Sequence, residues 1–139
     1  MAEYDRVKHL ELVSKAIERM DKGSSSMRAL SPAALGVALL LIDKSVPAWL
    51  ALSAAAFAIV VYWRQDALYL ARERAFRRLY DQARRGELDG DPYVMDIRRL
   101  YHQPTLWGCA WVGSIAGVHG SALLLTLLVF ATIGLKIWT

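Results

Sequence analysis

The sequence predicts an all-α integral membrane protein with three transmembrane helices, a cytoplasmic N-terminal amphipathic helix and a cytoplasmic extension of the second span. Three observations lead to this prediction. Hydrophobic residues make up 55% of the 139 residues, and the mean hydropathy is positive, which is unusual for a soluble domain. Nearly all charge lies in two blocks, 1–28 and 64–99, and long apolar stretches separate and follow them. Because arginine and lysine are costly in hydrocarbon, both blocks are expected on one wet side of a membrane.

The first expected element is a cytoplasmic amphipathic helix over residues 1–24. Leu10, Ile17 and Met20 recur at three- or four-residue multiples, and charged residues occupy the remaining faces. Gly23 is predicted to end this helix, and the serines that follow it are predicted to cap the next one. No cleavable signal is expected, because this charged segment lacks an apolar core.

A transmembrane hairpin is predicted over residues 25–63. Its apolar stretches, 29–42 and 46–63, are separated only by Asp43, Lys44 and Ser45. The first stretch is shorter than the roughly 20 residues that a span needs. We therefore expect this helix to begin near residue 25, with Pro32 close to its start and Arg28 snorkelling to the membrane interface.

The second span is predicted to continue as a helix into a cytoplasmic stalk and loop, residues 64–104, because no helix breaker precedes Gly86. Tyr69, Phe76 and Tyr80 fall on one side of this extension. A lone stalk could not bury them, and the N-terminal helix carries a matching apolar stripe. We therefore expect the two helices to form a cytoplasmic layer, either within one subunit or between subunits.

Asp66 and Glu73 lie seven residues apart, so they share one face of this helix near the membrane boundary. A salt-bridged interface with arginines of the N-terminal helix or of a neighbour is favoured over an acid–base role, and an ion-binding ring in an oligomer is the functional alternative. The residues expected at the oligomer or cytoplasmic interface are Leu10, Ile17, Met20, Asp66, Tyr69, Glu73, Phe76, Arg77 and Tyr80.

The last 35 residues, 105–139, carry one formal charge and would form a helix of about 50 Å, too long for a single straight span. We predict an interfacial helix over 105–119, a turn at residues 119–121, and a third transmembrane helix over 120–139. Trp107 and Trp111 lie four residues apart on one face of the interfacial helix. The residues expected as lipid headgroup or interface anchors are Arg28, Trp63, Trp107, Trp111, Lys136 and Trp138.

Positive charge predicts the orientation. Six Lys or Arg residues lie in 1–28 and nine in 64–104, whereas the first hairpin turn holds only Lys44. Both charged segments are therefore expected in the cytoplasm, with the N-terminus cytoplasmic and the C-terminus periplasmic. The arginines could bind anionic lipid headgroups, whereas interspersed carboxylates make nucleic-acid binding unexpected.

The sequence shows no catalytic pattern, and we expect neither a cofactor nor a metal. The three histidines, His9, His102 and His119, lie far apart, and Cys109 is the single cysteine. Arg98 and His102 could suggest a ribonuclease-like pair, but one helical turn between such residues is common. A membrane enzyme acting on lipid would need a pocket that joins His102 or Asp66 to the headgroup zone.

Two segments, KHLELVSKAIERM (8–20) and DALYLARERAFRRLYD (66–81), resemble the RipA family of small octameric bacterial inner-membrane proteins, and YVMD (93–96) does so more loosely. The resemblance implies a homo-oligomer, an octamer, in the bacterial cytoplasmic membrane, with no established catalytic residues to carry over. This chain departs from the family in its glycine- and serine-rich segment before the first span and in its tryptophan- and glycine-rich segment 105–120. The residues that carry the resemblance are His9, Leu10, Glu11, Ile17, Arg19, Met20, Asp66, Tyr69, Leu70, Glu73, Phe76, Arg77, Leu79, Tyr80 and Asp81.

The function predicted from the sequence is that of a non-enzymatic homo-oligomeric inner-membrane protein, a ring-like scaffold with a cytoplasmic helical layer. Its expected partners are other copies of itself and membrane lipids, and the sequence identifies no cytoplasmic protein partner. The alternative is an oligomeric channel or a membrane-disrupting effector, and a lipid-acting membrane enzyme is a third hypothesis.

Overall fold

All regular secondary structure in the described part of the chain is helical. The computed structural model describes residues 5–88, 93, 95–97 and 106–138. The helices are α1 (Arg6–Asp43), α2 (Ala48–Arg85), α3 (Leu106–Ala110) and α4 (Gly113–Trp138). Within the described residues, α1, α2 and 113–135 of α4 are long and apolar enough to cross a membrane. These findings confirm the predicted all-α class and the prediction of three helices long and apolar enough to span a membrane.

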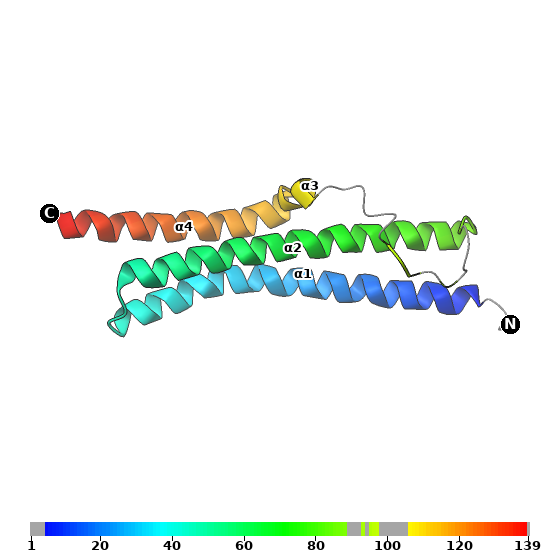
Figure 1. Ribbon diagram of the computed structural model, residues 1–139, viewed down its shortest axis with the longest axis horizontal. Helices are drawn as coiled ribbons and strands as arrows, with labels where there is room; N and C mark the ends of the chain where they lie inside the picture. Colours follow the sequence, from blue (N-terminus) through cyan, green and yellow to red (C-terminus); the bar gives the residue numbers. More distant parts are fainter. Residues whose placement is uncertain (1–4, 89–92, 94, 98–105, 139) are drawn as a thin grey trace.

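The antiparallel helices α1 and α2 form a long hairpin, and α4 lies along the half of it that contains the turn (Figure 1). We call residues 24–43, 48–66 and 113–138 the three-helix half, and residues 6–23 and 67–85 the two-helix half. Helices α1 and α2 have 38 residues each, which corresponds to about 57 Å at about 1.5 Å per residue. A hydrocarbon core measures about 30 Å. The two-helix half therefore projects beyond the hydrocarbon when the three-helix half spans it.

Helix α1 runs without interruption through Gly23 and Pro32, so the prediction of a separate N-terminal helix ending at Gly23 is wrong. Tertiary packing explains the glycine, because a Cβ atom on Gly23 would lie 2.7 Å from Cε1 of Tyr69 on α2. Gly23 thus permits close approach of the two helices instead of ending one. Pro32 is likewise interior to α1, where it removes the amide that would bond to the carbonyl of Arg28.

Three of the four ends of α1 and α2 follow standard capping chemistry. Asp5 caps α1 by accepting a hydrogen bond of 3.1 Å from the amide of Lys8. The turn after α1 is a Schellman motif, in which the amide of Val46 bonds to the carbonyl of Leu41, and Ser45 occupies the left-handed position with φ of 69°. Gly86 ends α2 with φ of 74°, which confirms the predicted continuous helix up to this glycine.

The third hydrophobic segment breaks at residues 111–112 and not at 119–121, so the predicted division between an interfacial helix over 105–119 and a span over 120–139 is wrong. His119, Gly120 and Ser121 lie within α4. The side chain of His119 is completely buried against the hairpin, which holds this segment in the helix. The short α3 precedes the break, and the span begins seven residues earlier than predicted, at Gly113.

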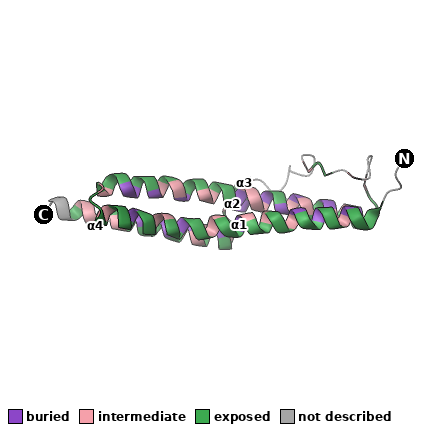
Figure 2. Ribbon diagram, turned by 90° about the horizontal axis from the view of Figure 1, so that it is seen from below, coloured by how far each residue is buried: buried purple, intermediate pink, exposed green. Residues whose placement is uncertain are grey.

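Small residues form most of the core in both halves, and the outer helix faces are exposed (Figure 2). In the three-helix half, Ala38, Ala51, Leu52 and Ala55 form a buried cluster against which Val129 and Ile133 of α4 pack. In the two-helix half, buried residues recur every four positions along α2. They are Ala67, Ala71, Ala75, Leu79 and Ala83. The small side chains allow the helix backbones to approach closely.

Candidate functional site

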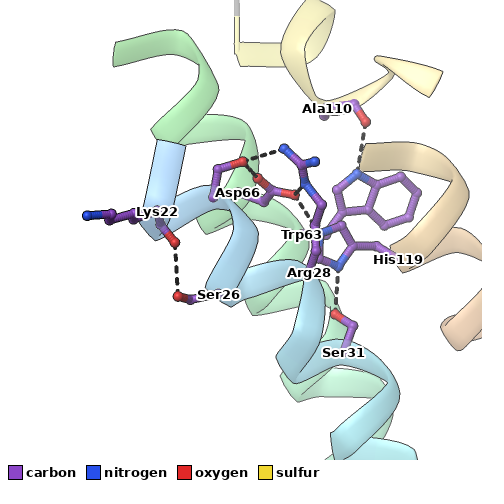
Figure 3. A network of polar contacts seen from close by, with 9 residues as sticks. Lys22, Ser26, Arg28, Ser31, Trp63, Asp66, Ala110 and His119 are labelled. Carbon is purple, nitrogen blue, oxygen red and sulfur yellow. Dashed lines mark hydrogen bonds and ion pairs between the residues drawn. The ribbon is translucent and has the colours of Figure 1, made fainter. Parts of the chain in front are cut away.

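A buried polar cluster joins α1, α2 and α4 where the two halves meet, and Asp66 of α2 is at its centre (Figure 3). Asp66 has no exposed surface. Its Oδ2 atom lies 3.1 Å from Nε of Arg28, and its Oδ1 atom accepts a short hydrogen bond from the hydroxyl of Ser24. Arg28 Nη2 also donates to Ser24 Oγ at 2.6 Å. Two α1 side chains therefore hold one α2 carboxylate through a closed set of contacts.

His119 connects this cluster to α4. Its Nε2 atom lies 3.0 Å from Oδ2 of Asp66, and its Nδ1 atom lies 2.6 Å from Oγ of Ser31 on α1. Both His119 and Ser31 are completely buried. Because a carboxylate only accepts hydrogen bonds, the proton on Nε2 points toward Asp66. When the ring is neutral, Nδ1 accepts a hydrogen bond from the Ser31 hydroxyl. The ion pair of Asp66 is made with Arg28.

An aromatic layer covers His119 on the side of α3. The Trp63 indole stacks on the His119 ring with centroids 6.1 Å apart and an interplanar angle of 16°. Its Nε1 atom donates to the carbonyl of Ala110 at 2.9 Å, and its ring meets Trp111 edge-on at 5.6 Å. The cluster therefore fixes α3 as well as α4 relative to the hairpin (Figure 3).

The position of the cluster gives these contacts their energetic importance. It lies about 18 residues, or about 27 Å, from the start of α2 at Ala48, near the end of a hydrocarbon layer of about 30 Å. Ionisable groups at such depth are expensive unless they are paired. Within the described residues, no buried side-chain nitrogen or oxygen lacks a hydrogen-bond partner. The cluster is thus a fully satisfied latch between the spans.

The order Ser31, His119, Asp66 has the connectivity of a hydrolase triad, but its surroundings do not suit nucleophilic catalysis. Ser31 has no exposed surface to meet a substrate. It lies inside α1, where backbone amides bond along the helix and cannot form an oxyanion hole. The lipid-enzyme hypothesis needs an open pocket at Asp66 or His102. Asp66 is fully enclosed, and His102 lies outside the described residues.

The predicted interface residues separate into two groups. Asp66 is enclosed within one chain, so it offers no surface to a second subunit. It pairs with Arg28, which was predicted as an interface anchor at the start of the first span and not as part of the N-terminal helix. Glu73 is also buried but pairs within its own helix, 2.7 Å from Arg77, whose side chain is 62% exposed. The remaining predicted residues are half-buried along the two-helix half. They are Leu10, Ile17, Met20, Tyr69, Phe76 and Tyr80.

The predicted membrane anchors also differ in their surroundings. Trp107 and Trp111 are 74% and 65% exposed, as residues that face lipid would be. Arg28 and Trp63 instead direct their polar groups into the protein, toward Asp66 and the Ala110 carbonyl. Lys136 and Trp138 lie in α4, but their side chains are outside the described part of the structure.

The other reactive groups form no second centre in the described part of the chain. His9 is buried beside the Tyr93 ring, with centroids 5.9 Å apart. Cys109 is buried between α3 and α2, with its sulfur 3.8 Å from Nη1 of Arg74, and burial raises the pKa of its thiol. No group of three potential metal ligands occurs among the described residues. Arg98, like His102, lies outside them.

Sequence reasoning missed Ser24, Ser31 and the role of His119. A signal for two of them was present, because Ser24, Arg28 and Ser31 have the spacing of one polar face at the entrance to an apolar helix. Ser24 was instead interpreted as one of the capping serines, and Ser31 was assigned no role. No local pattern links this face to His119, which is 88 residues from Ser31 in the sequence.

Comparisons of the chain with protein-family models, with curated proteins and with solved structures found no match.

Proposed function

We propose that the protein is a non-enzymatic homo-oligomeric scaffold of the bacterial cytoplasmic membrane, with both termini placed as the positive charges predict. In this proposal the two-helix half is cytoplasmic and forms a helical layer around or beneath a ring of spans. The resemblance of 8–20 and 66–81 to the RipA family supports eight subunits. Lipids and other copies of the chain are the proposed partners.

One observation carries the proposal, namely an open glycine face on α4. Gly113, Gly117 and Gly120 have the spacing of one helix face, and a Cβ atom added to any of them would meet nothing within 4 Å. Gly117 lies about 200° around the helix from His119, which belongs to the packed face. Three glycines lower helix propensity without aiding packing inside one chain. Such a face allows the close approach of another transmembrane helix.

The latch supports the same proposal by a different route. Because Asp66, Arg28 and His119 satisfy one another inside one chain, each subunit is held together without its neighbours. A subunit of this kind can present the glycine face of α4 in a constant orientation. Repeated association through one such face and its complement builds a closed ring when the rotation between neighbouring subunits closes.

The proposal is tested by measuring the subunit mass of the full-length protein in mild detergent by native mass spectrometry. We expect a single oligomer for the wild type and a loss of most of it in Gly117→Leu, because the leucine side chain would separate the helices. Gly36→Leu is the matched control, since Gly36 of α1 is equally open but lies outside the α4 face. A monomeric wild type, or an unchanged oligomer in Gly117→Leu, would contradict the proposal.

A second candidate function, an oligomeric channel or membrane-disrupting effector, is favoured by the ionisable groups within the spans. Intramembrane Asp, Arg and His residues commonly mark ion or proton pathways. Liposomes containing the purified protein and a pH-sensitive dye would test this function. Proton leakage that disappears in His119→Leu would favour a channel, whereas tight liposomes under all conditions would favour the scaffold.

A further inference from the structure

The groove between α2 and α3 has the shape and chemistry of a lipid site. Its volume is about 420 Å³, which is within the range of small-molecule pockets. The α2 side of the wall includes Val60, Trp63 and Arg64, and the α3 side includes Leu106 and Trp107. Trp111, which follows α3, also lines it. Apart from one guanidinium, these side chains are predominantly apolar.

The walls of the groove are held in place by contacts already described. The Trp63 indole is fixed by its hydrogen bond of 2.9 Å to the Ala110 carbonyl and by its stacking on His119. Trp111 packs edge-on against Trp63. The groove is therefore preformed, so a ligand would not have to order these rings on binding.

The α2 wall of the groove carries one charged side chain, Arg64, with apolar lining residues on either side of it. Val60 lies within the apolar stretch of α2, and Arg64 is the first charged residue of that helix. Arg64 is exposed and, among the described residues, has no carboxylate or other hydrogen-bond partner. It lies about 24 Å along α2 from Ala48, near the end of a hydrocarbon layer of about 30 Å, from where its long side chain can extend to the headgroups. The apolar groove thus holds one cation within reach of the headgroups, and no described residue neutralises it.

We infer that this groove binds one anionic phospholipid, with an acyl chain between α2 and α3 and its phosphate on Arg64. The exposed indoles of Trp107 and Trp111 would flank the glycerol region, where amphipathic rings are favoured. A second copy of the chain is a poorer occupant, because its spans offer no carboxylate for Arg64 except Asp66, which is buried, and Asp43, at the far end. The inference rests on the proposed membrane location and not on the subunit number.

The test is native mass spectrometry of the full-length protein with phosphatidylglycerol or phosphatidylcholine of identical acyl chains. We expect phosphatidylglycerol to bind about fivefold more tightly, the effect of one basic residue at a membrane surface. Arg64→Gln should remove this preference. Arg72→Gln is the matched control, because Arg72 is exposed on the same helix but does not line the groove. It should preserve the preference.

Two further experiments examine the apolar part of the groove, which is proposed to hold the acyl chain of the lipid. Val60→Phe should fill it and weaken both lipids alike while the preference between them persists. Glycerol phosphate, which lacks acyl chains, should not compete at the concentrations that saturate the lipid. Equal behaviour of Arg64→Gln and Arg72→Gln, or lipid retention unaffected by Val60→Phe, overturns the inference. Competition by glycerol phosphate at the lipid's own concentration overturns it as well.

The same spectra separate this inference from the proposed scaffold function, because they also report subunit number. Loss of lipid preference with an intact oligomer is the expected result for Arg64→Gln. An oligomer that changes size in Val60→Phe while its lipid retention stays constant would mean that a second subunit, and not a lipid, occupies the groove. A monomer that still binds phosphatidylglycerol selectively would contradict the proposed scaffold function but not the lipid inference.

Discussion

Asp66 and Glu73 are buried carboxylates seven residues apart on one helix, but they belong to differently organised regions. Asp66 lies in the three-helix half and contacts side chains from α1 and α4. Glu73 lies in the two-helix half and bonds to Arg77, one turn along its own helix. Although both carboxylates are buried, one belongs to a long-range latch and the other to a local ion pair.

The proposed membrane location accounts for this difference, because it places the three-helix half in lipid and the two-helix half in water. Lipid tails are as apolar as leucine, so spans gain little from burying apolar surface against one another, and polar contacts and close packing determine how they associate. In water, by contrast, removal of the apolar α2 stripe from solvent drives association of the two-helix half. A hydrogen-bonded latch is accordingly found between the spans, whereas an alanine and leucine stripe holds the projecting hairpin.

The largest expected effect is that of removing the latch carboxylate. Asp66→Ala should lower the free energy of unfolding by about 3–5 kcal/mol, because it leaves the partly buried Arg28 and the His119 ring without their acceptor. Glu73→Ala is the matched comparison and should cost less than about 1 kcal/mol, since its partner Arg77 is largely exposed. Denaturant titration in detergent, followed by circular dichroism, measures both. Similar losses for the two variants would contradict the distinction between latch and local pair.

A smaller effect is expected at the junction of the two halves. Gly23→Ala should destabilise the protein by about 1–3 kcal/mol, because the new Cβ would overlap the Tyr69 ring, whose Cε1 atom lies 2.7 Å from that position. Gly36→Ala should instead stabilise by up to about 1 kcal/mol, since its Cβ meets nothing and alanine favours the helix.

The double variant Gly23→Ala, Tyr69→Leu examines the cause of that loss. If the clash with the ring is responsible, Gly23→Ala should cost less in the Tyr69→Leu background than beside the native tyrosine, and a double-mutant cycle of thermal midpoints reports the difference. A cost that does not depend on the residue at position 69 would point to a different origin.

The smallest expected effects are at the two helix ends, one in each half. Ser45→Gly should stabilise the three-helix half by about 1 kcal/mol, because Ser45 has φ of 69° and glycine adopts this conformation without steric cost. Gly86→Ala should destabilise the two-helix half by a similar amount, since φ there is 74°. Thermal unfolding in detergent measures both, and a loss of stability in Ser45→Gly would contradict the cap assignment.

Much of the fold could be predicted from local patterns. Apolar length identified the spans, and the absence of a breaker before Gly86 identified the continuous α2. Gly23 was misinterpreted because a glycine that ends a helix and one that admits a neighbouring ring look the same in a sequence. The break before α4 was misplaced for a related reason, since the histidine, glycine and serine at 119–121 resemble a turn until a buried partner is found for His119.

The sequence by itself determined the helical class, the three spans and the segregation of charge, because hydropathy and periodicity depend only on neighbours along one helix. Only the tertiary structure decided that Asp66 meets Ser24, Arg28 and His119, and that Arg64 lies beside an apolar groove with no carboxylate partner among the described residues. The contacts of Asp66 join residues 38 to 53 positions apart. The partners of Asp66 depend on how the three helices are rotated and shifted against one another. Helical periodicity within one segment does not determine that arrangement.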